Sequence, residues 1–559
     1  MDHEANTNTL TIPSMPYRTG DLSTGRNTVY DPQTGDPNNG NGRVPFPRNT
    51  IPTSRIDPIA AKILSYLPAP NLPFVEATPS NNYFALLPAR KITDQFDVKM
   101  DYALTDKDRI SGRFSFSRPT TFQAPAFGDA GGPAQGAFQG SGWQKTYSSG
   151  INYNRTVTPT LLTELRVGVA HYHNEAQPTD YGKDDTTKLG IPGVNVNAFT
   201  SGFVGISIGN FSSPMVGYSA SLPWVRAEAN IDIVNSWTKI SKNHTFKVGG
   251  DLRRVRDDLL QDQTFSPRGV ITFGTNQTLT PGATGGVANN FANFLLGLPS
   301  SVGRDVNTYF PAMRLWQTFL YAADNWQISP KFTVNLGLRW EFYPPAVPRF
   351  PGGFSNYDFD KNQLVVAGVG GNPMNLGMVT RYKYFSPRVG LAYRVNDKTV
   401  VRIGSGLSYT PYPDNNYAYN FPVRSNNNYG TLLSTYLPAQ DPVTGSFIKL
   451  GTGFPPVRPV EVPSNGIISN PDVNSTYFVV PKDYTNPHVL SWNIAVQRSL
   501  PWHLALDLAY VGTHGIDIAA SPNLKLVPAW SMPERIKATR PSNSSARKAN
   551  GGMPAAFPV

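Results

Sequence analysis

Apolar and polar residues alternate along the chain from residue 96 onward. One set of alternate positions is apolar, namely Phe96, Val98, Met100, Tyr102 and Leu104. The positions between them are mostly polar, and a period of two places the two sets on opposite faces of a β-strand. The short segment 105–108 leads to a second alternating run that ends near Phe116. Two such runs joined by so few residues predict a β-hairpin.

This hairpin pattern recurs along the chain and predicts six hairpins, hence twelve antiparallel strands. The predicted short turns are residues 105–108, 158–160, 241–244, 329–331, 396–398 and 499–502. The connections between hairpins are long and rich in Gly, Pro, Asn and Ser. They span approximately residues 118–144, 174–225, 257–314, 343–384 and 410–487. Short turns at one end and long loops at the other are typical of outer-membrane barrels.

Strand length and aromatic placement favour a membrane barrel over a soluble sandwich, which would alternate in the same way. A tilted strand needs about ten residues to cross a bilayer, and the predicted strands have about this length. Aromatic residues lie near strand ends, as in an interfacial girdle: Trp143, Tyr172, Trp326, Trp340, Tyr343, Tyr409, Trp502 and Tyr510. We therefore predict an all-β fold, an antiparallel transmembrane β-barrel in the cell outer membrane. Its short turns would be periplasmic and its long loops extracellular, with outer-membrane lipid around its wall.

The polar face of the predicted wall carries many charges. These are Asp97, Lys99, Asp101, Arg113, Lys247, Asp251, Arg253, Arg339, Glu341, Arg388, Arg394 and Arg402. Because Arg or Lys at the bilayer midplane costs about 2–4 kcal/mol on the lipid side, we expect all of them to face the lumen. They would either contact a plug or solute, or compensate one another as a charge ladder along the wall. We favour the ladder.

The flanking regions predict three segments. Residues 1–90 form a loop region with a short helix near 57–67, where Asp57 caps and Pro58 takes the first helical position. Residues 91–520 form the barrel segment of six hairpins, and residues 521–559 form a loop or truncated tail. A second helical pattern covers residues 287–298. We expect residues 1–90 and 521–559 to be poorly ordered.

Composition excludes several other classes. The 559 residues include no cysteine, which excludes disulfides and a Cys nucleophile. The net charge is +11, but no basic run of five residues occurs, so no nucleic-acid partner is predicted. Phosphate-cradling glycine motifs and the zinc-protease motif are absent from the sequence. We predict neither an enzyme nor a cofactor.

Two features resemble metal sites weakly. His171 and His173 share a strand face, and a third ligand such as Asp180 or Asp184 would be needed beside them. The acidic loop clusters at 184–185 and 414–416 lack the spaced pattern of a calcium loop. We therefore interpret the histidines as an interfacial pair and predict no metal site.

Six segments resemble TonB-dependent outer-membrane receptors of the Oar-like type, whose members carry an N-terminal carboxypeptidase-regulatory-like domain. They are RIDPIAAKILSYLPAPN (55–71), DQFDVKMDYALTDKDRISGRFSFS (94–117), NNFANFLLGLPSS (289–301), NWQISPKFTVNLGLRWEFYPP (325–345), FSPRVGLAYRVNDKTVVRIGSGLSY (385–409) and NPHVLSWNIAVQRSLPWHLALDLAYVGTHG (486–515). The resemblance implies a barrel of about twenty-two strands, a plug in its lumen and energy from the periplasmic TonB complex.

The sequence departs from that family pattern. We find no signal peptide, TonB box, plug-like segment or carboxypeptidase-like domain, and only twelve strands. We therefore expect a partial barrel from an internal fragment, an open sheet with free edges at the strands beginning near 94 and ending near 513. The predicted function is part of a TonB-dependent transporter that takes up a bulky solute, which the loops do not identify. The alternative is a surface-exposed barrel or β-rich adhesion or structural protein without active transport.

Overall fold

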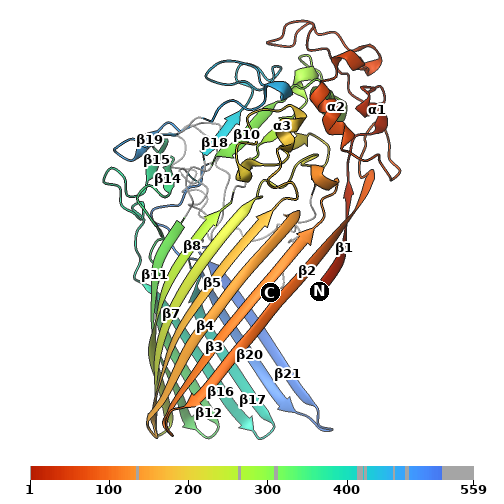
Figure 1. Cartoon of the computed structure of the whole chain (residues 1–559). Helices are drawn as coiled ribbons and strands as arrows, with labels where there is room; N and C mark the ends of the chain where they lie inside the picture. Colours follow the sequence, from red (N-terminus) through yellow and green to blue (C-terminus); the bar gives the residue numbers. More distant parts are fainter. Residues whose placement is uncertain are drawn as a thin grey trace.

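The long curved sheet of Figure 1 dominates the computed structural model, which describes residues 2–133, 138–261, 266–306, 312–411, 420, 425–457, 460–471 and 477–518. Twelve strands, here called the barrel wall, follow one another in chain order. They are β2 (Tyr83–Ala103), β3 (Asp108–Gln123), β4 (Gly140–Thr158), β5 (Leu161–Gln177), β7 (Trp224–Ser241), β8 (His244–Leu260), β11 (Ala312–Ser329), β12 (Phe332–Phe342), β16 (Tyr384–Asn396), β17 (Thr399–Tyr409), β20 (His488–Ser499) and β21 (Ala505–Ile516).

The twelve strands match the six predicted hairpins, and every neighbouring pair is antiparallel. The short turns lie together at the lower end in Figure 1, and the long connections gather at the upper end. The all-β prediction is therefore confirmed, as is the placement of short turns and long loops at opposite ends.

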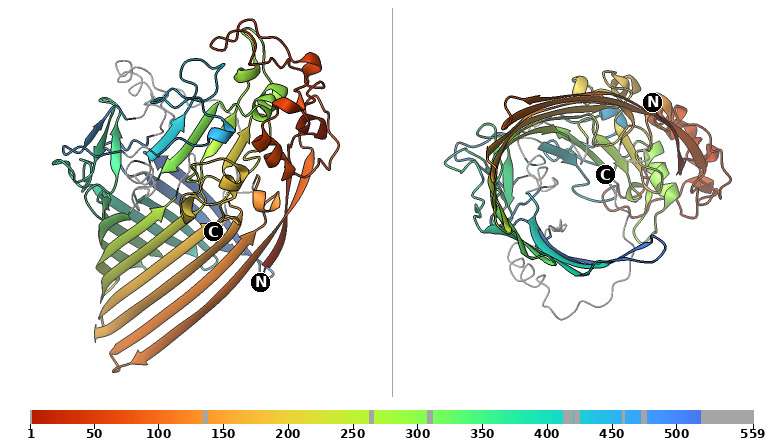
Figure 2. Two further views of the ribbon diagram at one scale, coloured as in Figure 1. Left: turned by 45° about the horizontal axis from the view of Figure 1, so that its top comes forward. Right: turned by 90° about the horizontal axis from the view of Figure 1, so that it is seen from below.

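The wall is curved but not closed (Figure 2). Among the described residues, β21 pairs only with β20, and the segment 92–103 of β2 pairs only with β3. The free edge expected at the first wall strand is thus limited to the lower half of β2.

The upper half of that edge is covered by β1 (Asp2–Leu10), whose residues pair with 83–91. The expectation that residues 1–90 would be poorly ordered is therefore wrong. The sequence of β1, DHEANTNTL, shows no apolar alternation. Backbone hydrogen bonds to the edge strand β2 hold β1 in the sheet, so the strand does not depend on a buried apolar face. Residues 519–559 lie outside the described part of the chain, so the expectation for the tail stays a prediction.

Residues 11–82 pack with the long loops into a cap above the wall. Its short helices are α1 (Met15–Arg18), α2 (Pro58–Ser65), α3 (Asp185–Leu189) and α4 (Val287–Leu295), with 3-10 turns η1 (Pro47–Asn49), η2 (Thr53–Arg55), η3 (Gly128–Ala130), η4 (Ala198–Thr200), η5 (Asn276–Thr278) and η7 (Leu450–Thr452). Buried Tyr17 and Phe291 have ring centroids 5.7 Å apart, which ties the first loop to α4. None of the helices described is long and apolar enough to cross a membrane.

The two predicted helices correspond to α2 and α4. The Asp57 side chain accepts hydrogen bonds from the backbone N–H of Ile59 (2.8 Å) and Ala60 (3.3 Å), so it caps α2 as predicted. Gly297 ends the second helical pattern with φ of 66°, a conformation that glycine adopts without strain.

Two small sheets complete the cap. One has the order β18-β10-β9-β6, formed by β6 (Gly205–Ile208), β9 (Val270–Phe273), β10 (Ser301–Val306) and β18 (Ser425–Tyr429). The other joins β14 (Ser355–Asp358), β15 (Gln363–Val366) and β19 (Ile467–Ser469), while β13 (Val347–Pro348) pairs with β11. These strands lie within segments predicted as loops, so the long connections are folded rather than extended.

Candidate functional site

The two faces of the barrel wall differ sharply in chemistry. On β2, Phe96, Val98 and Met100 point to one side with 53%, 47% and 71% of their surface exposed. Lys99 lies on the opposite face, directly across from Arg113 of β3. All twelve charged residues predicted for the lumen have the parity opposite to the exposed apolar side chains of their strands. Residues of the polar parity line the hollows of the wall, so we take this face as the inner one of the curved sheet that Figure 2 shows.

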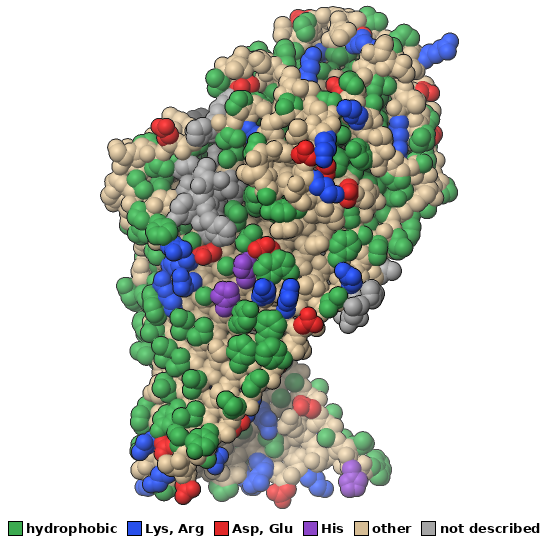
Figure 3. All heavy atoms as spheres, in the orientation of Figure 1, with side chains coloured by type: hydrophobic (Ala, Val, Ile, Leu, Met, Phe, Trp, Pro, Cys, Tyr) green, Lys and Arg blue, Asp and Glu red, His purple; other side chains and the backbone are tan. Residues whose placement is uncertain are grey.

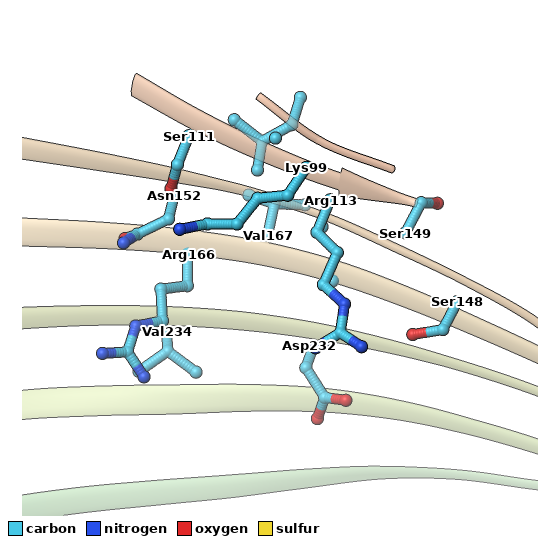
Figure 4. Close-up of a pocket in the computed structure, with 14 residues that line it drawn as sticks. Lys99, Ser111, Arg113, Ser148, Ser149, Asn152, Arg166, Val167, Asp232 and Val234 are labelled. Carbon is cyan, nitrogen blue, oxygen red and sulfur yellow. The ribbon is translucent and has the colours of Figure 1, made fainter. Parts of the chain in front are cut away.

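Five neighbouring strands line a lower hollow of about 370 Å³ on the inner face. Its walls include Lys99, Arg113, Asn152, Arg166 and Asp232, which come from β2, β3, β4, β5 and β7. Figure 4 shows the labelled side chains of Lys99, Arg113, Arg166 and Asp232 extending into this space. Three basic groups and one carboxylate therefore share one hollow.

Ion pairs run along the inner face. Arg113 contacts Asp97 at 2.9 Å, and Lys99 contacts Asp101 at 3.0 Å. Arg253 hydrogen-bonds to Asp232. Pairs between exposed groups are worth only about 0.2–1 kcal/mol each, so this ladder sets the charge pattern of the lumen more than the stability of the wall.

A second part of the ladder crosses β8 and β12. Arg339 lies 3.7 Å from Asp251 and 3.4 Å from Glu341. The hydroxyl groups of Ser386 (3.1 Å) and Tyr343 (2.8 Å) donate to the same Glu341 carboxylate. Asp251 and Glu341, both predicted for the lumen, thus share the guanidinium of Arg339.

A larger hollow of about 640 Å³ lies higher on the inner face. Arg226, which lines it, contacts Glu228 at 2.6 Å and Asp257 at 3.1 Å. The sequence prediction did not include these residues or Arg166, and it placed Asp257 in the long loop 257–314, whereas β8 continues to Leu260. Their parity within β5, β7 and β8 was the signal that would have identified them.

Four of the basic residues predicted for the lumen have no ion pair with a carboxylate in the described part of the chain. Arg394 donates to the backbone carbonyl of Pro330 at 3.2 Å. Within the described part of the chain, Lys247, Arg388 and Arg402 have no carboxylate partner. The inner face of β8, β16 and β17 therefore carries unpaired positive charge.

The predicted aromatic girdle is present only in part. Trp143 and Trp326 lie on the outer face, whereas Tyr172 and Tyr343 line inner hollows. Tyr172 has the parity of the inner face of β5, so its place near a strand end misled the prediction.

The structure separates the weak metal candidates. His173 Nε2 lies 3.0 Å from Glu175 on the wall. Asp180, in contrast, is buried in the cap, and its carboxyl group lies 3.6 Å from Arg268. Burial raises the pKa of this carboxyl group to about 6. Asp184 contacts Lys188 at 2.5 Å. Within the residues described, no three His, Asp or Glu side chains gather as a metal site would need. The cluster at 414–416 lies outside the described residues.

A model of the family described as outer membrane beta-barrel domain matches residues 1–554 of the chain. No curated protein matches the chain. Among solved structures, it is similar to a mutant of the ferric enterobactin receptor PfeA from Pseudomonas aeruginosa, with 10% identity, a TM-score of 0.36, and coverage of 77% of this chain and 43% of the receptor.

Two further solved structures are similar to a comparable extent. The ferripyoverdine receptor of the Pseudomonas aeruginosa outer membrane, bound to ferripyoverdine, shares 10% identity with a TM-score of 0.38, covering 77% of this chain and 44% of the receptor. The siderophore receptor PirA of the same organism shares 8% identity with a TM-score of 0.34, covering 77% and 51%. The chain thus spans about half, or less, of the length of these receptors.

Proposed function

Because the chain belongs to the outer membrane beta-barrel domain family, we propose that it forms a wall segment of an outer-membrane transporter that takes up a bulky solute. One observation carries this proposal. A mainly apolar outer face and a mainly polar inner face, charged on most strands, alternate along the wall. Lipid requires the first face, and a water-filled or plugged lumen requires the second.

The sheet edges support a wider barrel than these twelve strands. The lower half of β2 and the outer edge of β21 have no strand partner among the described residues. In lipid each unpaired backbone group costs several kcal/mol. We therefore propose that further strands complete the wall and that this chain is part of a larger barrel.

Energy coupling through the TonB complex is proposed from the sequence resemblance alone. Of the six segments that resemble Oar-like receptors, four lie in or directly beside wall strands, and the other two lie in the cap at α2 and α4. A plug would sit against the ladder formed by pairs such as Asp97 with Arg113. The unpaired cations Lys247, Arg388 and Arg402 would then be available to the plug or to the solute.

The experiment is a comparison of uptake in four strains, with and without the gene and with and without TonB. Labelled ferric siderophores, oligosaccharides and peptides form the panel of bulky solutes. Transport predicts that at least one solute enters only when both the gene and TonB are present. Equal uptake of every solute in all four strains would refute the transporter proposal.

The folded cap favours a second candidate, a surface-exposed barrel that acts in adhesion. Loops as long as these carry two small sheets and a buried core rather than open chain. If the panel shows no uptake, attachment of cells with and without the gene to mucin or matrix-coated surfaces tests this alternative directly.

A further inference from the structure

The outer face of the wall carries a cluster of charges at its upper end, separate from the inner ladder. Arg254 and Arg256 have the same parity on β8 as the exposed apolar residues Val248 and Leu252, so they point outward. Arg314 of β11 lies directly across from Arg256. Three guanidinium groups therefore gather on the outer side of the sheet; Arg256 is exposed, Arg254 is half-buried and Arg314 is buried.

The partners within this cluster neutralise it incompletely. Arg314 contacts Asp258 at 2.6 Å. The Arg254 guanidinium lies 5.1 Å from the ring centre of Trp316, a cation–π contact that adds no negative charge. Arg256 is exposed and, within the described residues, has no carboxylate partner. Like charges directly across a sheet repel, and Arg314 is buried beside Asp258, so the exposed Arg256 is the group that favours an external anion.

Two histidines of β5 lie beside the cluster, separated from it in the sheet only by two alanine side chains of β7. In the sheet register, Ala229 of β7 lies between Arg256 and His171, and Ala227 lies between Asp258 and His173. His171 and Arg256 are thus two strand spacings apart, about 10 Å, with only a methyl group between them. Beyond His173 lies Lys145, stacked 5.4 Å above Trp143. Glu175 contacts His173 and is the second carboxylate of this region.

The height of the cluster matches the outer boundary of the hydrocarbon. His244, stacked on Phe246 and Trp326, marks the lower aromatic ring. Arg254 is ten residues farther along β8, which is about 25 Å along the membrane normal for a strand tilted near 40°. This is the height of the apolar band in outer-membrane barrels. Figure 3 shows the charged and histidine side chains as a band above a mainly hydrophobic lower wall.

We call Arg254, Arg256, Arg314, His171 and His173 the outer basic cluster, and we propose that it binds the phosphate group of a lipid in the outer leaflet. The contacts would come from Arg254, Arg256 and the two histidines, because Arg314 is buried. A charge on the lipid face near the boundary is tolerated when an anionic headgroup meets it, and Arg suits phosphate because its N–H groups match the phosphate oxygens. The lipid chains would lie against the apolar residues below. This inference rests on the membrane location of the wall and on the extracellular side of its long loops, and it is independent of any transported solute.

The test uses the protein purified from outer membranes in neutral detergent and measures lipid binding by native mass spectrometry. The probes are bisphosphorylated lipid A, the same lipid without phosphate, and inorganic phosphate. We expect the phosphorylated lipid to bind, the dephosphorylated lipid to bind at least tenfold more weakly, and millimolar inorganic phosphate not to compete. Equal binding of both lipids, or displacement by inorganic phosphate, would overturn the proposal.

Variants locate the binding. Arg254→Gln with Arg256→Gln should weaken binding of the phosphorylated lipid about thirtyfold, since each basic residue near the headgroups contributes to the attraction. Arg254→Lys with Arg256→Lys keeps the charge and should stay within about threefold. The matched control, Lys331→Gln with Lys398→Gln, removes the same charge from exposed turns at the opposite end and should change nothing. Heat-modifiable gel mobility confirms folding of each variant; unchanged binding by the Gln pair, or an equal loss in the control, would contradict the assignment.

Discussion

The face assignment of the wall makes a quantitative prediction at Leu338 of β12. Its side chain is 48% exposed and lies across from Ala322 and Pro387, with no carboxylate opposite. It is six residues beyond Phe332, about 15 Å above the turns and hence near the bilayer midplane. Leu338→Arg should therefore cost about 2–4 kcal/mol, a loss of roughly thirtyfold to a thousandfold in the folding equilibrium.

Two variants on the same strand give the prediction its controls. Asn335→Arg places the same charge on the inner face and should cost less than about 0.5 kcal/mol. Leu336→Arg should fall between the two, because Asp324 lies directly opposite in the register and offers a partner. Unfolding in urea, followed by heat-modifiable gel mobility in lipid vesicles, measures all three. Equal midpoints for Leu338→Arg and Asn335→Arg would refute the face assignment.

Three further predictions concern single groups. Asp97→Asn should leave the urea midpoint nearly unchanged, because both partners of its pair with Arg113 are more than half exposed; a clear shift in the midpoint would mean that the ladder holds the wall together. Asp57→Ala should destabilise α2 by about 1 kcal/mol through loss of the cap, seen as faster amide exchange over residues 58–65, whereas unchanged exchange would contradict the capping role. Burial raises the pKa of Asp180 from 3.8 to about 6, so the folded cap binds this proton more tightly than the unfolded chain. The stability of the cap should therefore be greatest below about pH 4 and decline as the pH rises through 6. Asp180→Asn should remove most of this pH dependence, measured by amide exchange near Phe203.

The wall was predictable because each strand carries its own local signal. A run such as Phe332 to Phe342 alternates between lipid and lumen, and the turn residues beside it define the hairpin without reference to the rest of the chain. The inner position of residues such as Arg339 follows from the same parity. The additional ladder residues Arg226 and Asp257 have the same parity, but they lie at strand ends, where the sequence does not show how far each strand extends into the loop.

The cap was not predictable from such signals, because its contacts join segments far apart in the sequence. The Arg43 guanidinium donates to the carbonyl of Gln277 at 2.8 Å, and β10 pairs with β18 across more than a hundred residues. Strands of four to six residues within Gly- and Pro-rich segments have too few positions to show a period. The outer basic cluster was missed for a related reason: Arg254, Arg256 and Arg314 come together only when the register of β8 and β11 is known.

Cysteine scanning of β12 tests the central claim, that one face of the wall meets lipid and the other the lumen. The chain contains no cysteine, so each residue from 333 to 341 can be replaced singly without background. Outer-membrane vesicles would be treated with a membrane-impermeant maleimide, and parallel samples with a nitroxide-lipid quencher of an attached fluorophore. The account predicts a period of two, with quenching at 334, 336, 338 and 340 and maleimide labelling strongest at 335, 337 and 339. Labelling without alternation, or quenching at the odd positions, would contradict it.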